Sequence, residues 1–423
     1  MKRIESLDTK HFGLWLFPIY CIICFHFTEV KFAGVKLNEL VSLLTVPFLI
    51  SGIKSINKYL VYFLILFLSF LFITICLNLN TTFYLNLEGL SPLKLPYLIS
   101  VSRFIELLAC LSFALMIYKT INYYSNRGIE VSYTLRKVLN ANFYISAIFL
   151  LVFLLTYLNI LSLQNSSIVY DTTSYDPNNP TPRLRGFYVE GGPLGLFYAA
   201  LYILTFFIKG RKWLLRASFL LVLLCSQSKA GIVAVLAWHF YLFYQNFKSA
   251  KWFRYVVLTA LLPIFYLVFT MVIANYIHAV QNFSGIVAER QNDTNFVMGR
   301  IAAVFITPNM VMENPIFGVG LGNYALVRNN PDYLGILPPS KGWDAPGLGV
   351  FATLLVENGI YGLTLFILIL YFMYRRYSRT SVVSGEAIKV FVLICLLGVQ
   401  LHFLYIWFFI GLALAAPNDE IDS

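Results

Sequence analysis

Residues 59–77 read YLVYFLILFLSFLFITICL, without a charged side chain. An α-helix needs roughly 20 apolar residues to cross the hydrocarbon core of a bilayer. Runs of this kind recur along the chain, near 12–28, 37–53, 59–77, 98–118, 141–163, 187–208, 213–228, 230–247, 255–277 and 346–372. The sequence therefore predicts an all-α integral membrane protein, a polytopic bundle built as one transmembrane domain over residues 1–423.

The last apolar stretch, 387–416, leaves two alternatives. It forms either one tilted helix or a hairpin of two short helices around Gln400 and His402. The predicted number of spans is therefore eleven or twelve, and the side of the membrane that holds the C-terminus stays open.

Composition agrees with this class, because 59% of the residues are hydrophobic and only 12% are charged. Soluble domains carry about twice that share of charge. The net charge of +11 does not indicate nucleic-acid binding, because most Lys and Arg residues fall in alternate connections between the apolar runs. This positive-inside pattern predicts a cytoplasmic N-terminus. The first apolar run follows a basic start without a small-residue cleavage site, so we expect a retained signal-anchor.

Isolated polar groups inside the apolar runs are expected to be structural. Arg103 and Glu106 are three residues apart, on one helix face, and can neutralise each other. Cys21 and Cys24 have no second Cys or His pair and are expected to pack as small hydrophobic residues. The single histidines are expected to be packing residues: His26, His239 and His402.

Two long connections are predicted on the outward side of the membrane, at residues 164–186 and 278–345. The larger one contains FVMGRIAAVFITPNMVMENP, residues 296–315. Its apolar residues recur at helical spacing, which predicts an amphipathic helix lying at the membrane interface. Ionisable residues gather on this face rather than at mid-membrane, where a secondary transporter is expected to carry them.

Arginines at the edges of apolar segments are the strongest candidates for binding. The stretch TPRLRGFYVEGGPLGLF, residues 181–197, places Arg183 and Arg185 just before a predicted span. Arg300 lies within the predicted interfacial helix, where an unpaired guanidinium is costly. A guanidinium matches phosphate oxygens two at a time. By contrast, we expect solvated loop charges at Arg290, Arg328 and Lys341.

A glycine-rich segment follows the predicted interfacial helix. The run NPIFGVGLGNY contains Gly318, Gly320 and Gly322, whose backbone N–H groups are candidates for approaching a phosphate. The run lacks the strand–helix context and the lysine of a nucleotide-binding loop.

Four segments together resemble a known family. RLRGFYVEGGPLGLFYAALYIL, SQSKAGIVAVL, GRIAAVF with NPIFGVGLGNY, and FATLLVENGIYGLTLFIL occur in the order found in bacterial O-antigen polymerases and ligases. The resemblance covers residues 181–374. It implies a GT-C-like, inverting, metal-independent glycosyltransferase without a cofactor, in the bacterial inner membrane.

The resemblance also implies substrates and partners. Donor and acceptor are oligosaccharides linked to undecaprenyl pyrophosphate, and a chain-length regulator protein in the same membrane is an expected partner, as are membrane lipids but not nucleic acid. Functional arginines of the family carry over to Arg185, with Arg183 as the near alternative, and to Arg300. A carboxylate is needed near the acceptor hydroxyl, and the candidates for this base are Glu190 and Asp344.

One departure separates the two branches of the family. Ligases carry a histidine about nine residues before the Glu-x-Gly of the span that follows the large loop. Here that register gives Leu348, before Glu357 and Gly359. The departure favours a Wzy-type polymerase, which joins repeat units. The alternatives are a ligase, which transfers the finished chain to the lipid A core, and a lipid-linked oligosaccharide flippase.

Overall fold

The computed structural model describes residues 15–32, 35–47, 56–86, 88, 90–161, 168–171, 182–247, 259, 285, 297–344 and 347–415. Most of these residues are helical. Within these described ranges, four helices are long and apolar enough to cross a membrane: α4 (Lys58–Asn78), α5 (Leu98–Ser125), α6 (Val131–Tyr157) and α16 (Val350–Tyr377). The chain is an all-α, multi-pass membrane protein, as predicted.

Shorter helices complete the bundle. They are Trp15–His26, α2 (Leu37–Leu43), α7 (Gly191–Leu204) with η4 (Thr205–Phe207), α8 (Trp213–Cys225), α9 (Lys229–Phe247), α17 (Val382–Leu396) and α18 (Leu404–Ala415). The predicted span 255–277 lies outside the described residues, except for Thr259.

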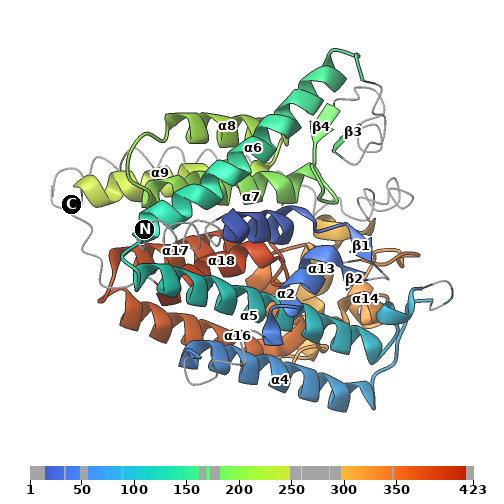
Figure 1. Ribbon diagram of the computed structural model, residues 1–423. Helices are drawn as coiled ribbons and strands as arrows, with labels where there is room; N and C mark the ends of the chain where they lie inside the picture. Colours follow the sequence, from blue (N-terminus) through green and yellow to red (C-terminus); the bar gives the residue numbers. More distant parts are fainter. Residues whose placement is uncertain are drawn as a thin grey trace.

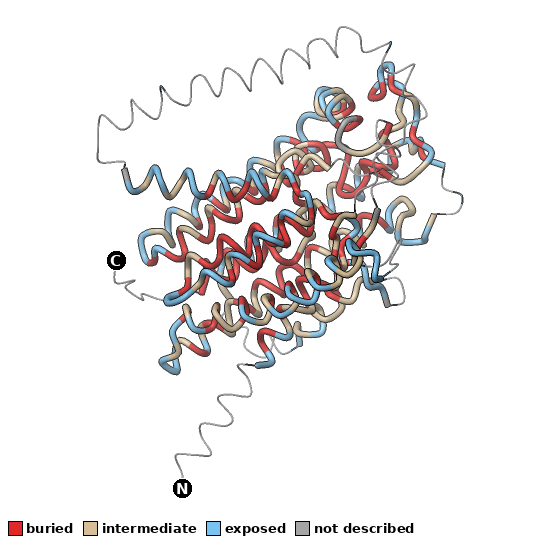
Figure 2. Tube along the Cα trace, turned by 90° about the horizontal axis from the view of Figure 1, so that it is seen from above, coloured by how far each residue is buried: buried red, intermediate tan, exposed pale blue. Residues whose placement is uncertain are grey.

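The helices form two groups that pack side by side (Figure 1). One group contains α6, α7, α8 and α9, and the other contains α4, α5, α16, α17 and α18. The groups meet where α17 packs on α7 and α5 packs on α6. Figure 2 shows buried residues running through the middle of the bundle and on into the loops at one end.

Helix α18 lies at the centre of the second group, against α5 and α17. Every residue from Leu404 to Ala415 is buried. The Trp407 ring contacts Phe63 of α4 and Phe391 of α17 edge to face. The helix is apolar on all sides because it has no face in contact with solvent or lipid.

Helices α17 and α18 are separate, which decides between the two alternatives for residues 387–416. At the start of α17, Gly385 packs against Ser378, just beyond the end of α16, and at its end Cys395 lies against Gly349, just before α16. His402 approaches Arg103 near the start of α5, and Gly411 packs against Ala114 further along it. The two helices therefore form a hairpin, and its turn lies at the same end of the bundle as the start of α5.

Short elements crowd that end, which we call the loop end. They are β1 (Lys31–Phe32), β2 (Val35–Lys36), η2 (Pro92–Lys94), β3 (Val169–Asp171), β4 (Pro182–Leu184), α13 (Gly299–Glu313), α14 (Tyr324–Val327) and α15 (Pro331–Leu334) (Figure 1). Helix α13 corresponds to the predicted interfacial helix. It packs through Ala302, Ile306 and Met310 into a second apolar cluster with Leu326 of α14.

Candidate active site

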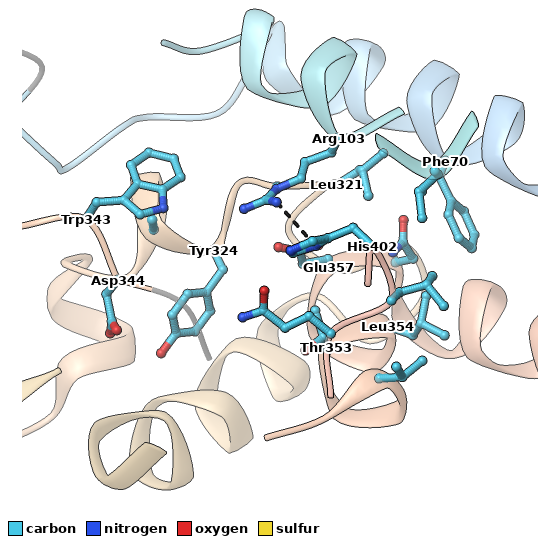
Figure 3. Close-up of a pocket in the computed structure, with 17 residues that line it drawn as sticks. Phe70, Arg103, Leu321, Tyr324, Trp343, Asp344, Thr353, Leu354, Glu357 and His402 are labelled. Atoms are coloured by element: carbon cyan, nitrogen blue, oxygen red, sulfur yellow. Dashed lines mark hydrogen bonds between the residues drawn. The ribbon is translucent and has the colours of Figure 1, made fainter. Parts of the chain in front are cut away.

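A pocket opens at the loop end between α5 and α16, and we call it the α5–α16 pocket. Its polar lining includes Arg103, Tyr324, Glu357 and His402, with Trp343 on the same wall as Asp344. Figure 3 shows the Arg103 side chain between Trp343 and His402, with Glu357 next to His402. The lining comes from six separate parts of the chain: α4, α5, the segment before and within α14, the segment of Trp343 and Asp344, α16 and the α17–α18 turn.

Behind the pocket lies a network of paired charges. Arg103 Nη1 is 2.5 Å from Glu106 Oε2, which confirms the pair expected from the i,i+3 spacing. The network extends further than expected, because the Lys36 ammonium lies 2.8 Å from Glu39 and 3.2 Å from Glu106. Burial disfavours the charged form of Lys36, but the Glu106 and Glu39 carboxylates outweigh it and raise the pKa of Lys36. Such pairing is what allows charges to lie among apolar helices.

His402 is more than a packing residue. Its Nδ1 lies 3.3 Å from Arg103 Nη1 and its ring stacks on Phe403. Because a guanidinium has no acceptor, Nδ1 must accept the hydrogen bond, which leaves Nε2–H as a donor on a neutral ring. The expectation of a packing role is wrong for His402. It holds for His26, which contacts Asn142, and for His239, which contacts Tyr202.

Helix α16 bends at the base of the pocket, and the glycine-rich segment fits into the bend. Gly359 has non-helical angles, φ 63° and ψ −167°. The N–H groups of Val319 and Gly320 donate to the carbonyls of Val356 and Glu357, at 2.9 and 2.8 Å. A Cβ on Gly359 would lie 2.2 Å from the Ile316 carbonyl oxygen, so only glycine allows this close approach.

The glycine amides are therefore engaged within the protein. The N–H of Gly318 donates to Asn314, that of Gly320 donates to the Glu357 carbonyl, and that of Gly322 is directed at the Glu357 side chain. The expectation that Gly318, Gly320 and Gly322 form a phosphate cradle is not met by this geometry. Their role is to bring the segment against α16 and to hold Glu357.

Arg183 and Arg185 lie together on an aromatic side chain. Strand β4 pairs with β3, so that Arg183 is opposite Tyr170. Both guanidinium groups lie over the Tyr170 ring, at 5.9 and 5.6 Å from its centroid. Arg183 Nε also donates to the Ser226 carbonyl at 2.7 Å. Arg183 thus ties β4 to the α8–α9 turn, whereas Arg185 makes a longer contact of 3.4 Å with Val189 O.

Glu190 occupies the residue before α7, which begins at Gly191. Its side chain is exposed and makes no capping hydrogen bond to the helix. Glu190 is close enough to Tyr170 to help raise the pKa of that phenol, for which burial is the largest cause. Glu190, Arg183 and Arg185 therefore share one corner of the loop end.

Asp344 has a different environment from the one expected of a base. Its carboxylate pairs with Arg328 and accepts a hydrogen bond from the Gly299 N–H at 2.8 Å. Arg328 also donates to Val297 O at 2.9 Å and is fully buried, so its prediction as a solvated loop charge is wrong. The pair fixes the start of α13. It places the Arg300 backbone in the first turn of that helix, next to the pocket wall.

Sequence reasoning missed the basic rim of the pocket. Lys94 in η2 lies over the Trp343 ring at 4.9 Å, and Lys31 in β1 lies nearby. The only local signal was the run SPLKLPY, in which two prolines hold Lys94 in a short turn between spans.

Comparison with known proteins adds one finding. No curated protein matches the chain. Residues 213–367 match the family model described as O-antigen ligase, which spans less than half of the chain. The matched segment includes Arg300, the glycine-rich segment, Asp344 and Glu357, whereas Arg183, Arg185 and Glu190 precede it. The match supports a place in the O-antigen ligase and polymerase superfamily and does not distinguish between its two branches.

Proposed function

We propose that this protein is an O-antigen polymerase of the bacterial inner membrane, with its N-terminus in the cytoplasm and its loop end in the periplasm. It transfers a growing oligosaccharide from undecaprenyl pyrophosphate onto the sugar of a second lipid-linked repeat unit. The reaction inverts the anomeric carbon and uses no metal. A chain-length regulator in the same membrane is the expected protein partner.

The observation that carries this proposal is the gathering of cationic side chains at the loop end of a chain that matches the O-antigen ligase family. Arg183 and Arg185 share the Tyr170 ring, and the Arg300 backbone lies at the pocket wall. Planar guanidinium groups suit the paired oxygens of a pyrophosphate.

The arginines act on the leaving group in this mechanism. Breaking the bond between the anomeric carbon and the carrier develops negative charge on the pyrophosphate. Arg185 and Arg300 stabilise that charge more strongly in the transition state than in the ground state, which lowers the barrier. Removing one such group typically costs on the order of 10²–10³ in rate. Arg183 holds β4 in place through its bond to Ser226 and completes the cationic surface.

Glu190 is the proposed general base. Its carboxylate is exposed beside the arginines, and a carboxylate can accept the proton of the acceptor hydroxyl during attack. Asp344 is the weaker candidate, because Arg328 and the Gly299 N–H already occupy its oxygens.

A ligase is the second candidate, because the family-model match fits both branches equally. His402 also brings a histidine to the α5–α16 pocket from the α17–α18 turn, although the register in which ligases carry theirs holds Leu348, a packing residue.

The experiment is complementation of a strain in which the gene is deleted, with surface polysaccharide resolved on a gel. Wild-type protein is expected to restore a ladder, and Arg185→Ala at equal membrane level is expected to leave a single repeat unit on the lipid core. A ligase instead leaves the core without any unit while long chains accumulate on the carrier. A flippase strands lipid-linked units on the inner leaflet. A full ladder in the deletion strain excludes the proposal.

A further inference from the structure

Three cations from three separate elements lie around the mouth of the α5–α16 pocket. Arg103 of α5 lines the pocket, Lys94 of η2 lies over Trp343 on its wall, and Lys31 comes from β1. Lys31 and Arg103 lie close enough to Lys94 for their positive charges to lower its pKa.

Two of these three cations are not paired with a carboxylate within the described part of the chain, whereas Arg103 is. Among the ion pairs of the described residues, none joins Lys31 or Lys94 to a carboxylate, and the Arg103 partner, Glu106, is shared with Lys36. Burial lowers the pKa of Lys94, and the neighbouring charges of Lys31 and Arg103 lower it further. An anion bound between these groups relieves their repulsion.

Trp343 gives the mouth a second kind of contact. Its indole is partly exposed and lines the pocket, and the Lys94 ammonium lies 4.9 Å from the ring centroid. An aromatic face with a polar edge packs against the apolar face of a sugar ring. Cation and indole together suit a ligand that joins a phosphate to a sugar.

The mouth is distinct from the surface that holds Arg183 and Arg185, yet adjacent to it. Glu29 connects the two regions, because Lys36, Lys31 and Arg185 all act on its carboxyl group. Burial nevertheless dominates and raises the pKa of Glu29. One cation from each region, Lys31 and Arg185, is thus close enough to Glu29 to act on its charge.

We propose that Lys31, Lys94 and Arg103, with Trp343, bind the pyrophosphate and first sugar of the acceptor, a second lipid-linked oligosaccharide. This assignment rests on the proposed polymerase, whose donor and acceptor each carry a pyrophosphate. Arg185 and Arg300 hold the donor, and Lys94 holds the acceptor.

The test counts bound carrier lipids on the full chain. The purified protein in phosphatidylcholine nanodiscs is titrated with undecaprenyl pyrophosphate, and the complexes are weighed by native mass spectrometry. Wild-type protein is expected to bind two lipids. Lys94→Gln is expected to bind one of them at least about tenfold more weakly, and Arg185→Ala is expected to weaken the other. Lys31→Gln provides a second variant at the same mouth.

Lys58 provides a matched control. It lies at the start of α4, away from the loop end, with its ammonium 5.4 Å from the centroid of the Tyr59 ring. Lys58→Gln is expected to keep both lipids, and Lys94→Arg is expected to restore the second. A wild-type protein that binds one lipid, or Lys94 and Lys31 variants that still bind two with unchanged affinity, overturns the inference. So does a second lipid that phosphatidylglycerol nanodiscs displace completely, because the site then binds phospholipid headgroups.

The outcome is independent of the ladder experiment. Two bound lipids with an unaltered ladder in the deletion strain support this site and reject the polymerase. One bound lipid with loss of the ladder rejects this site and leaves the polymerase standing.

Discussion

Arg328 and Asp344 form an ion pair in which both side chains are shielded from solvent, with 0% and 3% of their surface exposed. The pair lies beneath α13, in a loop predicted to be solvated, and it holds the Gly299 N–H as well. A buried charge that loses its partner is left uncompensated, and this typically costs about 3–5 kcal/mol.

We therefore expect Arg328→Met to lower the free energy of unfolding by about 3–5 kcal/mol. It should also reduce the amount of folded protein in the membrane. Asp344→Asn, which keeps the shape and removes the charge, is expected to lower stability as well. Melting temperature in detergent is the measurement. An Asp344→Asn protein with wild-type stability and no polymerisation would instead identify Asp344 as a catalytic base.

Replacing Gly359 or Gly318 with alanine is expected to prevent the glycine-rich segment from packing into the α16 bend. The added Cβ would lie 2.2 Å from Ile316 O at Gly359, and 2.4 Å from Val356 O at Gly318. Both contacts are with backbone, so the segment must move. Gly335 is the matched control, because it also has positive φ, 59°, but has nothing within 4 Å of the added Cβ. Gly335→Ala should cost only the backbone strain of a non-glycine residue at φ 59° and ψ −116°, on the order of 1–3 kcal/mol. Equal melting temperatures for the three variants would contradict this account.

Glu190→Gln and Glu357→Gln are expected to fail in different ways. Glu190 is exposed, and glutamine has nearly the same shape, so its amide variant should fold normally and lose polymerisation. Glu357 lies close to the backbone amides of Gly322 and Tyr324 and to Arg103, which favour its charged form, so its variant should lose stability first. The ladder and the melting temperature are measured on the same preparations. Normal ladders from a stable Glu190→Gln protein would remove Glu190 from the mechanism.

The pair Arg103 and Glu106 is expected to be coupled. Arg103→Gln leaves Glu106 with only Lys36 as a close cation, at 3.2 Å, whereas the double variant with Glu106→Gln removes both charges together. The double variant should therefore be more stable than the sum of the two single-variant effects predicts. A complete double-mutant cycle of melting temperatures measures this. Strict additivity would show that the pair contributes nothing to stability.

Lys94 predicts a specific pH dependence. Because burial and then Lys31 and Arg103 lower its pKa in the folded protein, the unfolded chain holds this proton more tightly. The destabilisation that comes from holding Lys94 charged in the folded protein is fully present when the pH is below the folded-state pKa. It disappears as the pH rises from there to the usual pKa of 10.5. Wild-type protein should therefore gain melting temperature relative to Lys94→Gln as pH rises through that window. A difference in melting temperature that stays constant from pH 7 upward would show that neither burial nor the charges of Lys31 and Arg103 disfavour the charged form of Lys94.

Two of the longest apolar runs predicted their helices closely, because a continuous apolar surface has few alternatives in a membrane. The span predicted at 59–77 is α4, Lys58–Asn78, and the one predicted at 346–372 is α16, Val350–Tyr377. The spans predicted at 141–163 and 37–53 were placed less well, since α6 is Val131–Tyr157 and α2 ends at Leu43. Boundaries failed where a turn competes with the helix. Residues 187–190 were predicted to be helical, yet the N–H of Tyr188 donates to Arg185 O and α7 begins at Gly191.

Local pattern identified Arg183 and Arg185 because their spacing before a span is visible in the sequence. The pocket was missed because its groups are distant along the chain. Arg103 and His402 are 299 residues apart, and no periodicity relates them. Arg328 was misjudged for a similar reason, since its burial depends on how α13 and α14 cover it.

The central position of α18 has a consequence for biogenesis. Of the helices that the structure describes, α18 is the last to leave the ribosome, yet it fills the middle of the group that contains α4, α5, α16 and α17. Those four helices must therefore enter the bilayer before the partner that joins them exists. Assembly of the α5–α16 pocket, whose wall includes the turn leading into α18, is consequently a post-insertion event, and stalled chains that lack this helix should be substrates for membrane proteases.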